Sequence, residues 1–128
     1  MKEKRCCCIS KLWLSQHNGD TGNPALHLGS QSIHIDAIKR AATANEKHKK
    51  VIMESMQGGL DFLSYIKEKM CDSGGVEFVQ CGVSGGALGT ELYEYISGYM
   101  GDGLNVIMYP NKVRWHYGKV IPEGHPSF

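Results

Sequence analysis

The chain has 128 residues, enough for one domain that buries about two-thirds of its surface on folding. Hydrophobic residues make up 41% and charged residues 21% of the sequence, a composition that excludes wholesale disorder. No apolar run is long enough to predict a transmembrane helix. With a net charge of +1, we expect neither a membrane nor a nucleic acid as the partner.

The cysteines are Cys6, Cys7, Cys8, Cys71 and Cys81. An odd number with three adjacent residues is a poor disulfide framework, because neighbouring cysteines do not easily bridge one another. The short apolar stretch at the N-terminus is interrupted by lysine and lacks a signal-peptide cleavage pattern. We therefore expect free thiols and a cytoplasmic protein, and we assign no role to residues 6–8.

The first part of the chain predicts one strand and a long loop. Residues 6–14 contain apolar, β-compatible side chains, whereas residues 15–31 have the polar and glycine-rich composition of a loop. We expect Ser32 to Ile35 to form a short extended piece. The loop is long for a compact domain, and the sequence assigns no role to it.

Two helices are predicted next. Asp36 is a suitable N-cap, and apolar residues recur at helical spacing over residues 37–57. Gly58–Gly59 is expected to end that helix. A second helix is predicted from Asp61, and Gly74–Gly75 is expected to stop it.

The second half of the chain is rich in β-compatible residues. Residues 76–81 predict a strand, and residues 87–100 fit a helical stripe better than a strand, although both interpretations stay open. Residues 104–109 and 113–117 are separated by a short turn, which favours an antiparallel hairpin.

Together these elements predict an α+β fold, with two or three helices packed on one face of a small antiparallel sheet of three to five strands. We expect a single domain over residues 1–128. Its segments are a strand and long loop (1–35), a helical half (36–72), a sheet-rich half (76–121) and an extended tail (122–128).

The most distinctive motif lies at residues 81–88, Cys-Gly-Val-Ser-Gly-Gly-Ala-Leu. A strand, a G-x-S-x-G turn and a helix in this order resemble the nucleophile elbow of patatin-like lipases and α/β-hydrolases. The resemblance implies a nucleophilic Ser84, with Asp102 and either His116 or His125 as acid and base. The chain is too short for the strand–helix units of such enzymes, and it lacks their upstream glycine-rich oxyanion loop.

Two other interpretations of this loop remain. Backbone N–H groups of Gly82, Ser84, Gly85 and Gly86 at the start of a helix favour binding of a phosphate group. The glycine spacing matches neither the dinucleotide fingerprint nor the P-loop. Alternatively, the glycines serve only a tight turn between strand and helix, and this interpretation is the one we favour.

The sequence predicts no metal site and no cofactor. His17, His27 and His34 accompany the cysteines of residues 6–8 in the first third of the chain. Neither the histidines nor the cysteines have the paired spacing of zinc ligands.

Tyrosine and tryptophan are more frequent in the second half than one small core requires, which indicates an interface or a ligand pocket. In the expected hairpin, Ile107, Tyr109, Arg114 and His116 share the face away from the helices. We therefore expect a homodimer through these residues. The favoured function is a small binding or accessory module without catalysis, with a serine hydrolase or a phosphate- or nucleotide-binding domain as alternatives.

Overall fold

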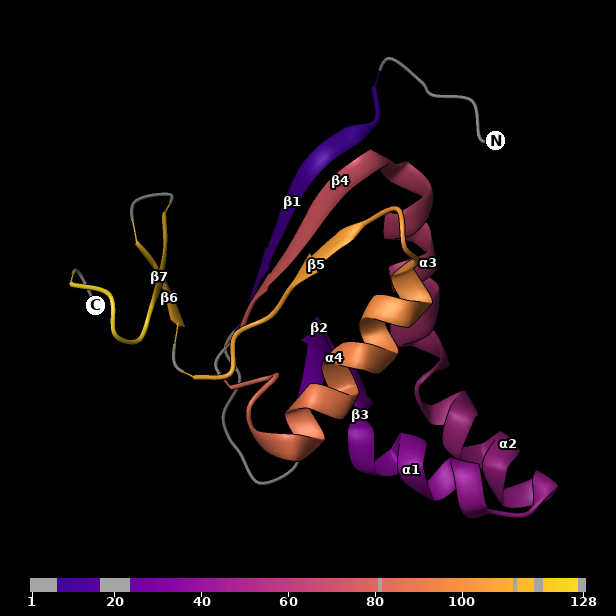
Figure 1. The fold of residues 1–128 in the computed structure, drawn as a ribbon. Helices are drawn as coiled ribbons and strands as arrows, with labels where there is room; N and C mark the ends of the chain where they lie inside the picture. Colours follow the sequence, from indigo (N-terminus) through magenta and orange to yellow (C-terminus); the bar gives the residue numbers. More distant parts are fainter. Residues whose placement is uncertain (1–6, 17–23, 81, 112, 117–118, 127–128) are drawn as a thin grey trace.

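The computed structural model describes residues 7–16, 24–80, 82–111, 113–116 and 119–126. The strands are β1 (Ile9–Ser15), β2 (Ala25–Leu28), β3 (Gln31–His34), β4 (Met70–Val79), β5 (Asn105–Ile107), β6 (Val113–His116) and β7 (Lys119–Pro122). The helices are α1 (Ile35–Thr43), α2 (Glu46–Ser55), α3 (Gln57–Lys69) and α4 (Gly86–Met100) (Figure 1). Within the described ranges, none of these helices has the length and apolar character needed to cross a bilayer.

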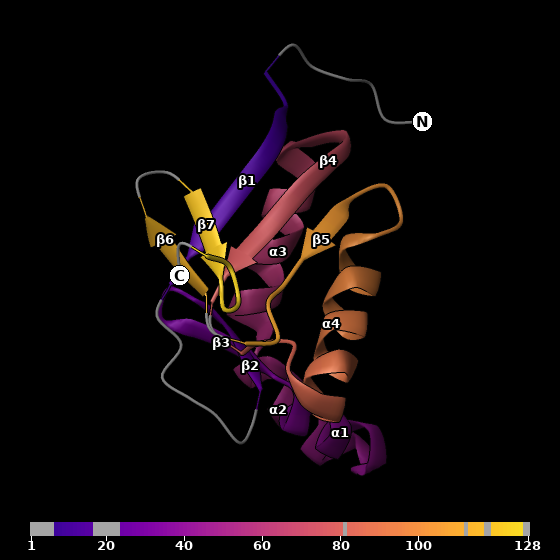
Figure 2. The same ribbon diagram turned by 60° about the vertical axis from the view of Figure 1, so that its left-hand side comes forward.

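The central sheet has the order β1-β4-β5, and both pairings are parallel (Figure 2). Side chains alternate across β4, so that Val76 and Phe78 are fully buried on one face. They belong to the same apolar core as Leu63 of α3 and Leu92 of α4. These two helices thus provide the main cover for the sheet.

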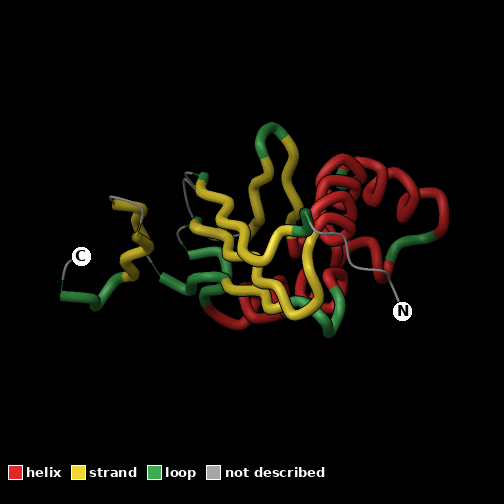
Figure 3. Tube along the Cα trace, turned by 90° about the horizontal axis from the view of Figure 1, so that it is seen from above, coloured by secondary structure: helices red, strands yellow, loops and turns green. Residues whose placement is uncertain are grey.

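The prediction of an antiparallel sheet is wrong, although the α+β class is correct. Residues 87–100 form α4, which crosses over from β4 to β5, and a crossover helix makes the strands on either side of it parallel. The turn expected at residues 110–112 does not close a hairpin. β6 pairs instead with β7, and the two strands form a sheet of their own, separate from β1-β4-β5 (Figure 3).

The long helix predicted over residues 37–57 is two helices. α1 ends at Thr43, and α2 begins after Asn45, whose side chain accepts a hydrogen bond from the backbone N–H of His48 at 2.9 Å. This capping bond satisfies one free N–H of the new helix and stabilises the break. The N-cap of α1 is His34, so Asp36 lies in the first turn and not at the cap.

Gly58–Gly59 lies in the first turn of α3 and does not end a helix. A Cβ atom on Gly59 would lie 3.1 Å from the side chain of Ile33, so the glycine lets α3 approach β3 closely. α3 begins earlier than predicted and ends at Lys69, because β4 starts immediately at Met70. Gly74–Gly75 therefore lies within a strand.

The predicted loop over residues 15–31 contains a strand. β2 pairs with β3 in an antiparallel hairpin, and Leu26 and Ile33 are fully buried. Two glutamines attach this hairpin to the carboxyl ends of the central strands. The Gln80 side-chain amide exchanges two hydrogen bonds with the backbone of His27, and the Gln16 amide does the same with Gly29.

The expectation of free thiols is wrong for two cysteines. Cys8 and Cys71 form a disulfide between the start of β1 and the start of β4, across 63 positions of sequence. Cys7 is exposed. Cys6 and Cys81 lie outside the described residues. The two bridged residues are distant in sequence, which is why their pairing was not evident from spacing.

Candidate functional site

The glycine-rich loop at residues 82–85 connects β4 to α4 and lies at the carboxyl end of the parallel sheet. Two hydrogen bonds tie it to the segment that follows β5. Gly82 N–H donates to the carbonyl of Asn111 at 2.9 Å, and Ser84 N–H donates to the carbonyl of Tyr109 at 3.3 Å. The loop thus joins the ends of two adjacent parallel strands, the place where α/β sheets commonly bind ligands.

Each glycine of the motif meets a local requirement of the chain. Gly82 and Gly86 have φ near +68°, a conformation that other residues rarely adopt. A Cβ atom on Gly85 would lie 2.5 Å from the carbonyl oxygen of Pro110, and one on Gly89 would overlap the backbone of Ser84. The spacing G-x-x-G-G-x-x-G is therefore explained by the turn and its packing, and the glycines alone do not indicate a ligand.

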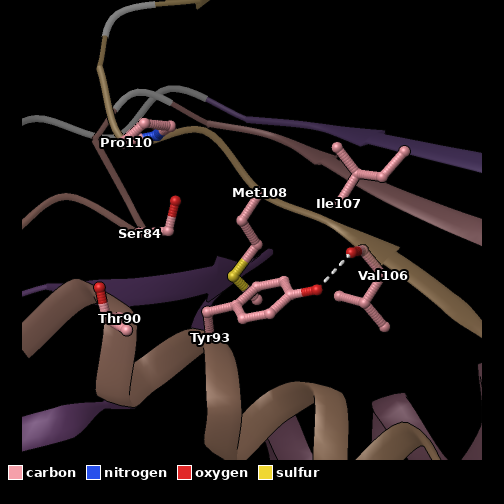
Figure 4. Close-up of a pocket in the computed structure, with 7 residues that line it drawn as sticks. All are labelled: Ser84, Thr90, Tyr93, Val106, Ile107, Met108 and Pro110. Carbon is pink, nitrogen blue, oxygen red and sulfur yellow. Dashed lines mark hydrogen bonds between the residues drawn. The ribbon is translucent and has the colours of Figure 1, made fainter. Parts of the chain in front are cut away.

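A pocket of about 390 Å³ opens beside this loop, between the first turns of α4 and the end of β5 (Figure 4). Ser84 and Thr90 contribute hydroxyl groups, and the Tyr93 hydroxyl donates to the carbonyl of Val106 at 3.2 Å. The remaining lining is mostly apolar. The full lining is Ser84, Thr90, Tyr93, Val106, Ile107, Met108 and Pro110.

The N-terminus of α4 adds backbone donors to this region. Its first internal hydrogen bond runs from Gly89 N–H to the carbonyl of Gly85 at 3.0 Å, so the preceding N–H groups at 86–88 have no partner within the helix. In the described structure, the Gly85 N-cap has no side-chain cap and the first turn has no acidic residue. The positive end of the helix dipole is thus available to an anion.

The structure does not bring together Ser84 and Asp102 of the hydrolase hypothesis. Ser84 precedes α4 and Asp102 follows it, and a helix of 15 residues is roughly 22 Å long. His116 lies in β6, and His125 lies beyond β7, where its backbone N–H donates to the carbonyl of Pro122. Ser84 and Asp102 therefore do not belong to one catalytic triad in this structure.

The residues expected at a dimer interface are divided between two elements. Ile107 ends β5 and lines the pocket, while Arg114 and His116 lie in β6. The Tyr109 hydroxyl donates a hydrogen bond to the nearly buried carboxylate of Glu77. The same carboxylate forms an ion pair with Lys11, with Nζ at 3.1 Å from Oε1. Burial, followed by the bond and the charge of Glu77, raises the pKa of Tyr109 well above its ordinary range.

A second pocket, of about 430 Å³, lies between the turn of the β2–β3 hairpin, α1 and the end of α2. It is more polar than the first, with several serines and the side chains of His34, Asp36 and Arg40. Nearby, the ring of His27 lies 6.4 Å from that of His34, and its Nδ1 is 3.0 Å from the Ser32 hydroxyl. No group of three or more potential metal ligands occurs among the described residues.

Comparisons of the chain with known protein families, with curated proteins and with solved structures give no significant match.

Proposed function

We propose that the protein is a binding module for a small molecule with an anionic group, such as a phosphate, bound at the carboxyl end of β4 and β5. The supporting observation is the position of the 390 Å³ pocket. It adjoins both the uncapped N-terminus of α4 and the loop at the end of a parallel strand. The helix N-terminus would bind the anion, and the apolar wall at Val106 and Met108 would contact the rest of the ligand.

Binding without catalysis is favoured by the pocket lining. Acid–base catalysis near neutral pH requires a side chain that titrates in that range. Among the described residues that line the pocket there is no histidine, carboxylate or lysine, and the one ionisable group is the phenol of Tyr93. This hydroxyl donates to the backbone of Val106.

The proposal can be tested by calorimetric titration with inorganic phosphate and with nucleoside mono- and diphosphates. Thr90→Leu, which replaces a pocket hydroxyl with a larger apolar group, should weaken binding at least tenfold. Thr43→Leu is the matched control, because Thr43 and Thr90 both lie in helices and both donate to a preceding carbonyl. If no ligand binds, or if both variants bind equally, the site is wrongly assigned.

Disulfides persist mainly in oxidising compartments. The Cys8–Cys71 bridge therefore weighs against the cytoplasmic location that the sequence predicts. The homodimer stays a prediction.

A further inference from the structure

The second pocket, of about 430 Å³, is separate from the pocket beside the glycine-rich loop. Its walls are the turn of the β2–β3 hairpin, α1 and the end of α2, and these elements lie together at one end of the molecule (Figure 1). Within the described residues, the linings of the two pockets have no member in common. The volume of the second pocket lies in the range of small-molecule sites, so it is an independent candidate for a binding site.

Two opposite charges of α1 lie on the wall of this pocket. Asp36 and Arg40 both line it, and their spacing of four residues puts them on the same face of the helix. Among the described residues, neither the Asp36 carboxylate nor the Arg40 guanidinium forms an ion pair. By contrast, the ammonium group of Lys39 on the same helix lies 3.0 Å from the Glu91 carboxylate. The pocket thus presents one negative and one positive group that no described side chain neutralises.

These two charges select a ligand that carries both signs. The guanidinium of arginine binds a carboxylate through two parallel hydrogen bonds, and the carboxylate of Asp36 accepts hydrogen bonds from an ammonium group. Cβ atoms four residues apart on a helix are roughly 6 Å from each other, so one small molecule can contact both side chains. An α-amino acid has its ammonium and carboxylate groups on a single carbon atom and satisfies Asp36 and Arg40 together.

The rest of the lining indicates what kind of side chain the ligand has. The other polar groups around the pocket are an amide, an imidazole and several serine hydroxyls. They donate and accept hydrogen bonds without requiring a further charge on the ligand. Ala37 and Met56 are buried and add an apolar surface that suits methylene groups. A side chain with a short aliphatic stem and an uncharged polar end matches this combination.

We propose that the second pocket binds a free α-amino acid with an uncharged polar side chain, represented by L-glutamine. Arg40 binds the α-carboxylate of the ligand, and Asp36 binds its α-ammonium group. The aliphatic part of the ligand lies against Ala37 and Met56. This site does not depend on anion binding at α4, because the two pockets have different linings.

Two analogues of L-glutamine test the need for both charges. Glutaramate lacks only the α-amino group, and γ-aminobutyramide lacks only the α-carboxylate. Each analogue leaves one charge of the pocket without a partner. Calorimetric titration of the unmodified chain should therefore show that L-glutamine binds at least about tenfold more tightly than either analogue.

Substitution of each charged residue should remove the matching preference. Asp36→Asn should bind L-glutamine at least about tenfold more weakly and should no longer prefer it over glutaramate. Arg40→Gln should weaken L-glutamine to a similar extent and should no longer prefer it over γ-aminobutyramide. A merely structural role of these residues would not exchange the two preferences in this way.

Two control variants match these changes in charge and position. Glu46→Gln removes an acid from the first turn of α2, as Asp36→Asn does from the first turn of α1. Lys39→Gln removes the positive charge next to Arg40, and that charge is already paired with Glu91. Both controls should bind L-glutamine as the unmodified chain does.

Failure of L-glutamine to bind, or equal affinity for L-glutamine and either analogue in the unmodified chain, would overturn the proposal. Weaker binding by Asp36→Asn and Arg40→Gln with both preferences retained would also overturn it, and circular dichroism verifies that these variants are folded. Thr90→Leu, in the pocket beside α4, should leave the affinity for L-glutamine unchanged. A loss of affinity in Thr90→Leu would mean that the amino acid binds beside α4 and not at α1.

Discussion

The side-chain amide of Gln80 forms two hydrogen bonds with the backbone of His27, accepting from its N–H at 3.0 Å and donating to its carbonyl at 2.7 Å. Gln80 is 1% exposed and follows β4 directly. Its amide thus takes the place of a neighbouring strand and holds β2 against the end of the central sheet.

Replacing Gln80 with leucine should destabilise the protein by about 2–4 kcal/mol, because two backbone groups then lose their partner in a buried place. Chemical denaturation measures this change in the free energy of unfolding. Gln16→Leu is the control, since Gln16 makes the same pair of bonds to Gly29 at an exposed position. Gln16→Leu should lower the free energy of unfolding by less than about 1 kcal/mol, because water can replace the lost bonds. If both substitutions lowered the free energy of unfolding equally, burial would not be what makes the Gln80 bonds important.

The disulfide between Cys8 and Cys71 should be detectable by counting thiols. Denatured protein should gain two reactive thiols on reduction, and Cys71→Ser should remove that difference. In the chain-entropy description, a bridge across 63 positions stabilises the native state by about 4 kcal/mol. The melting temperature should therefore fall on addition of a reductant in the unmodified protein, but not in Cys71→Ser. An unchanged thiol count on reduction would exclude the bridge.

The stability of the β2–β3 hairpin should depend on pH through His27. Burial, and secondarily the proximity of His34, lowers the pKa of His27 below its ordinary value. Between these two pKa values the unfolded chain binds more protons than the native one, so stability rises with pH. The contribution of His27 to the free energy of unfolding is therefore complete above about pH 6.5, and it declines as the pH falls below that value.

His27→Gln should therefore reduce the loss of unfolding free energy between pH 7.5 and pH 5. Urea denaturation at the two pH values gives this difference. His48→Gln, at an exposed position of α2, serves as the control and should behave as the unmodified chain. An identical pH dependence in all three proteins would show that His27 is not the group responsible.

Tyr109 should remain un-ionised at a pH where exposed tyrosines have lost their proton. Burial and the hydrogen bond to Glu77 raise the pKa of its hydroxyl. Absorbance at the phenolate band during an alkaline titration should show a late component that Tyr109→Phe removes. The stability provided by this raised pKa is complete below about pH 10 and is lost above it.

Tyr95 provides an internal comparison for that titration. Burial, and then Tyr99 nearby, also raises its pKa, without a carboxylate partner. Tyr95→Phe should remove a component that titrates earlier than the one removed by Tyr109→Phe. If Tyr109→Phe removes an early component and leaves the late one in place, the bond to Glu77 is absent in solution.

Local periodicity identified the elements whose signal lies within one segment. The apolar stripe over residues 87–100 predicted α4, and the β-compatible residues after position 8 predicted β1. The break at Asn45 was also readable, because asparagine is a strong N-cap, but the helical pattern on both sides concealed it. Gly58–Gly59 has the composition of a helix end, and only the approach of β3 explains its place within α3.

Strand direction and the site depend on contacts between distant segments. Nothing within residues 104–109 distinguishes a partner at β4 from one at β6, so the sheet was predicted antiparallel. The glycine-rich loop was evident from sequence. Thr90 and Tyr93 were not linked to it, because their approach to Met108 exists only after α4 packs on β5. The amide of Gln80 likewise had no visible partner before folding.

Two glycines of α4 have opposite roles, and alanine at each position should reveal the difference. Gly98 is exposed with open space around its Cα, so Gly98→Ala should stabilise the protein by about 0.5–1 kcal/mol through lower chain entropy in the unfolded state. Gly89 is buried against the backbone of Ser84, and the added methyl would overlap the Ser84 carbonyl carbon. Gly89→Ala should therefore destabilise the protein by about 1–3 kcal/mol. Both changes replace glycine with alanine in the same helix, so the gain in intrinsic helix propensity is the same for each. The difference between their effects on the free energy of unfolding therefore measures how closely the glycine-rich loop packs on α4. Stabilisation by both alanines would mean that the loop does not pack as described and that the adjoining pocket has a different shape.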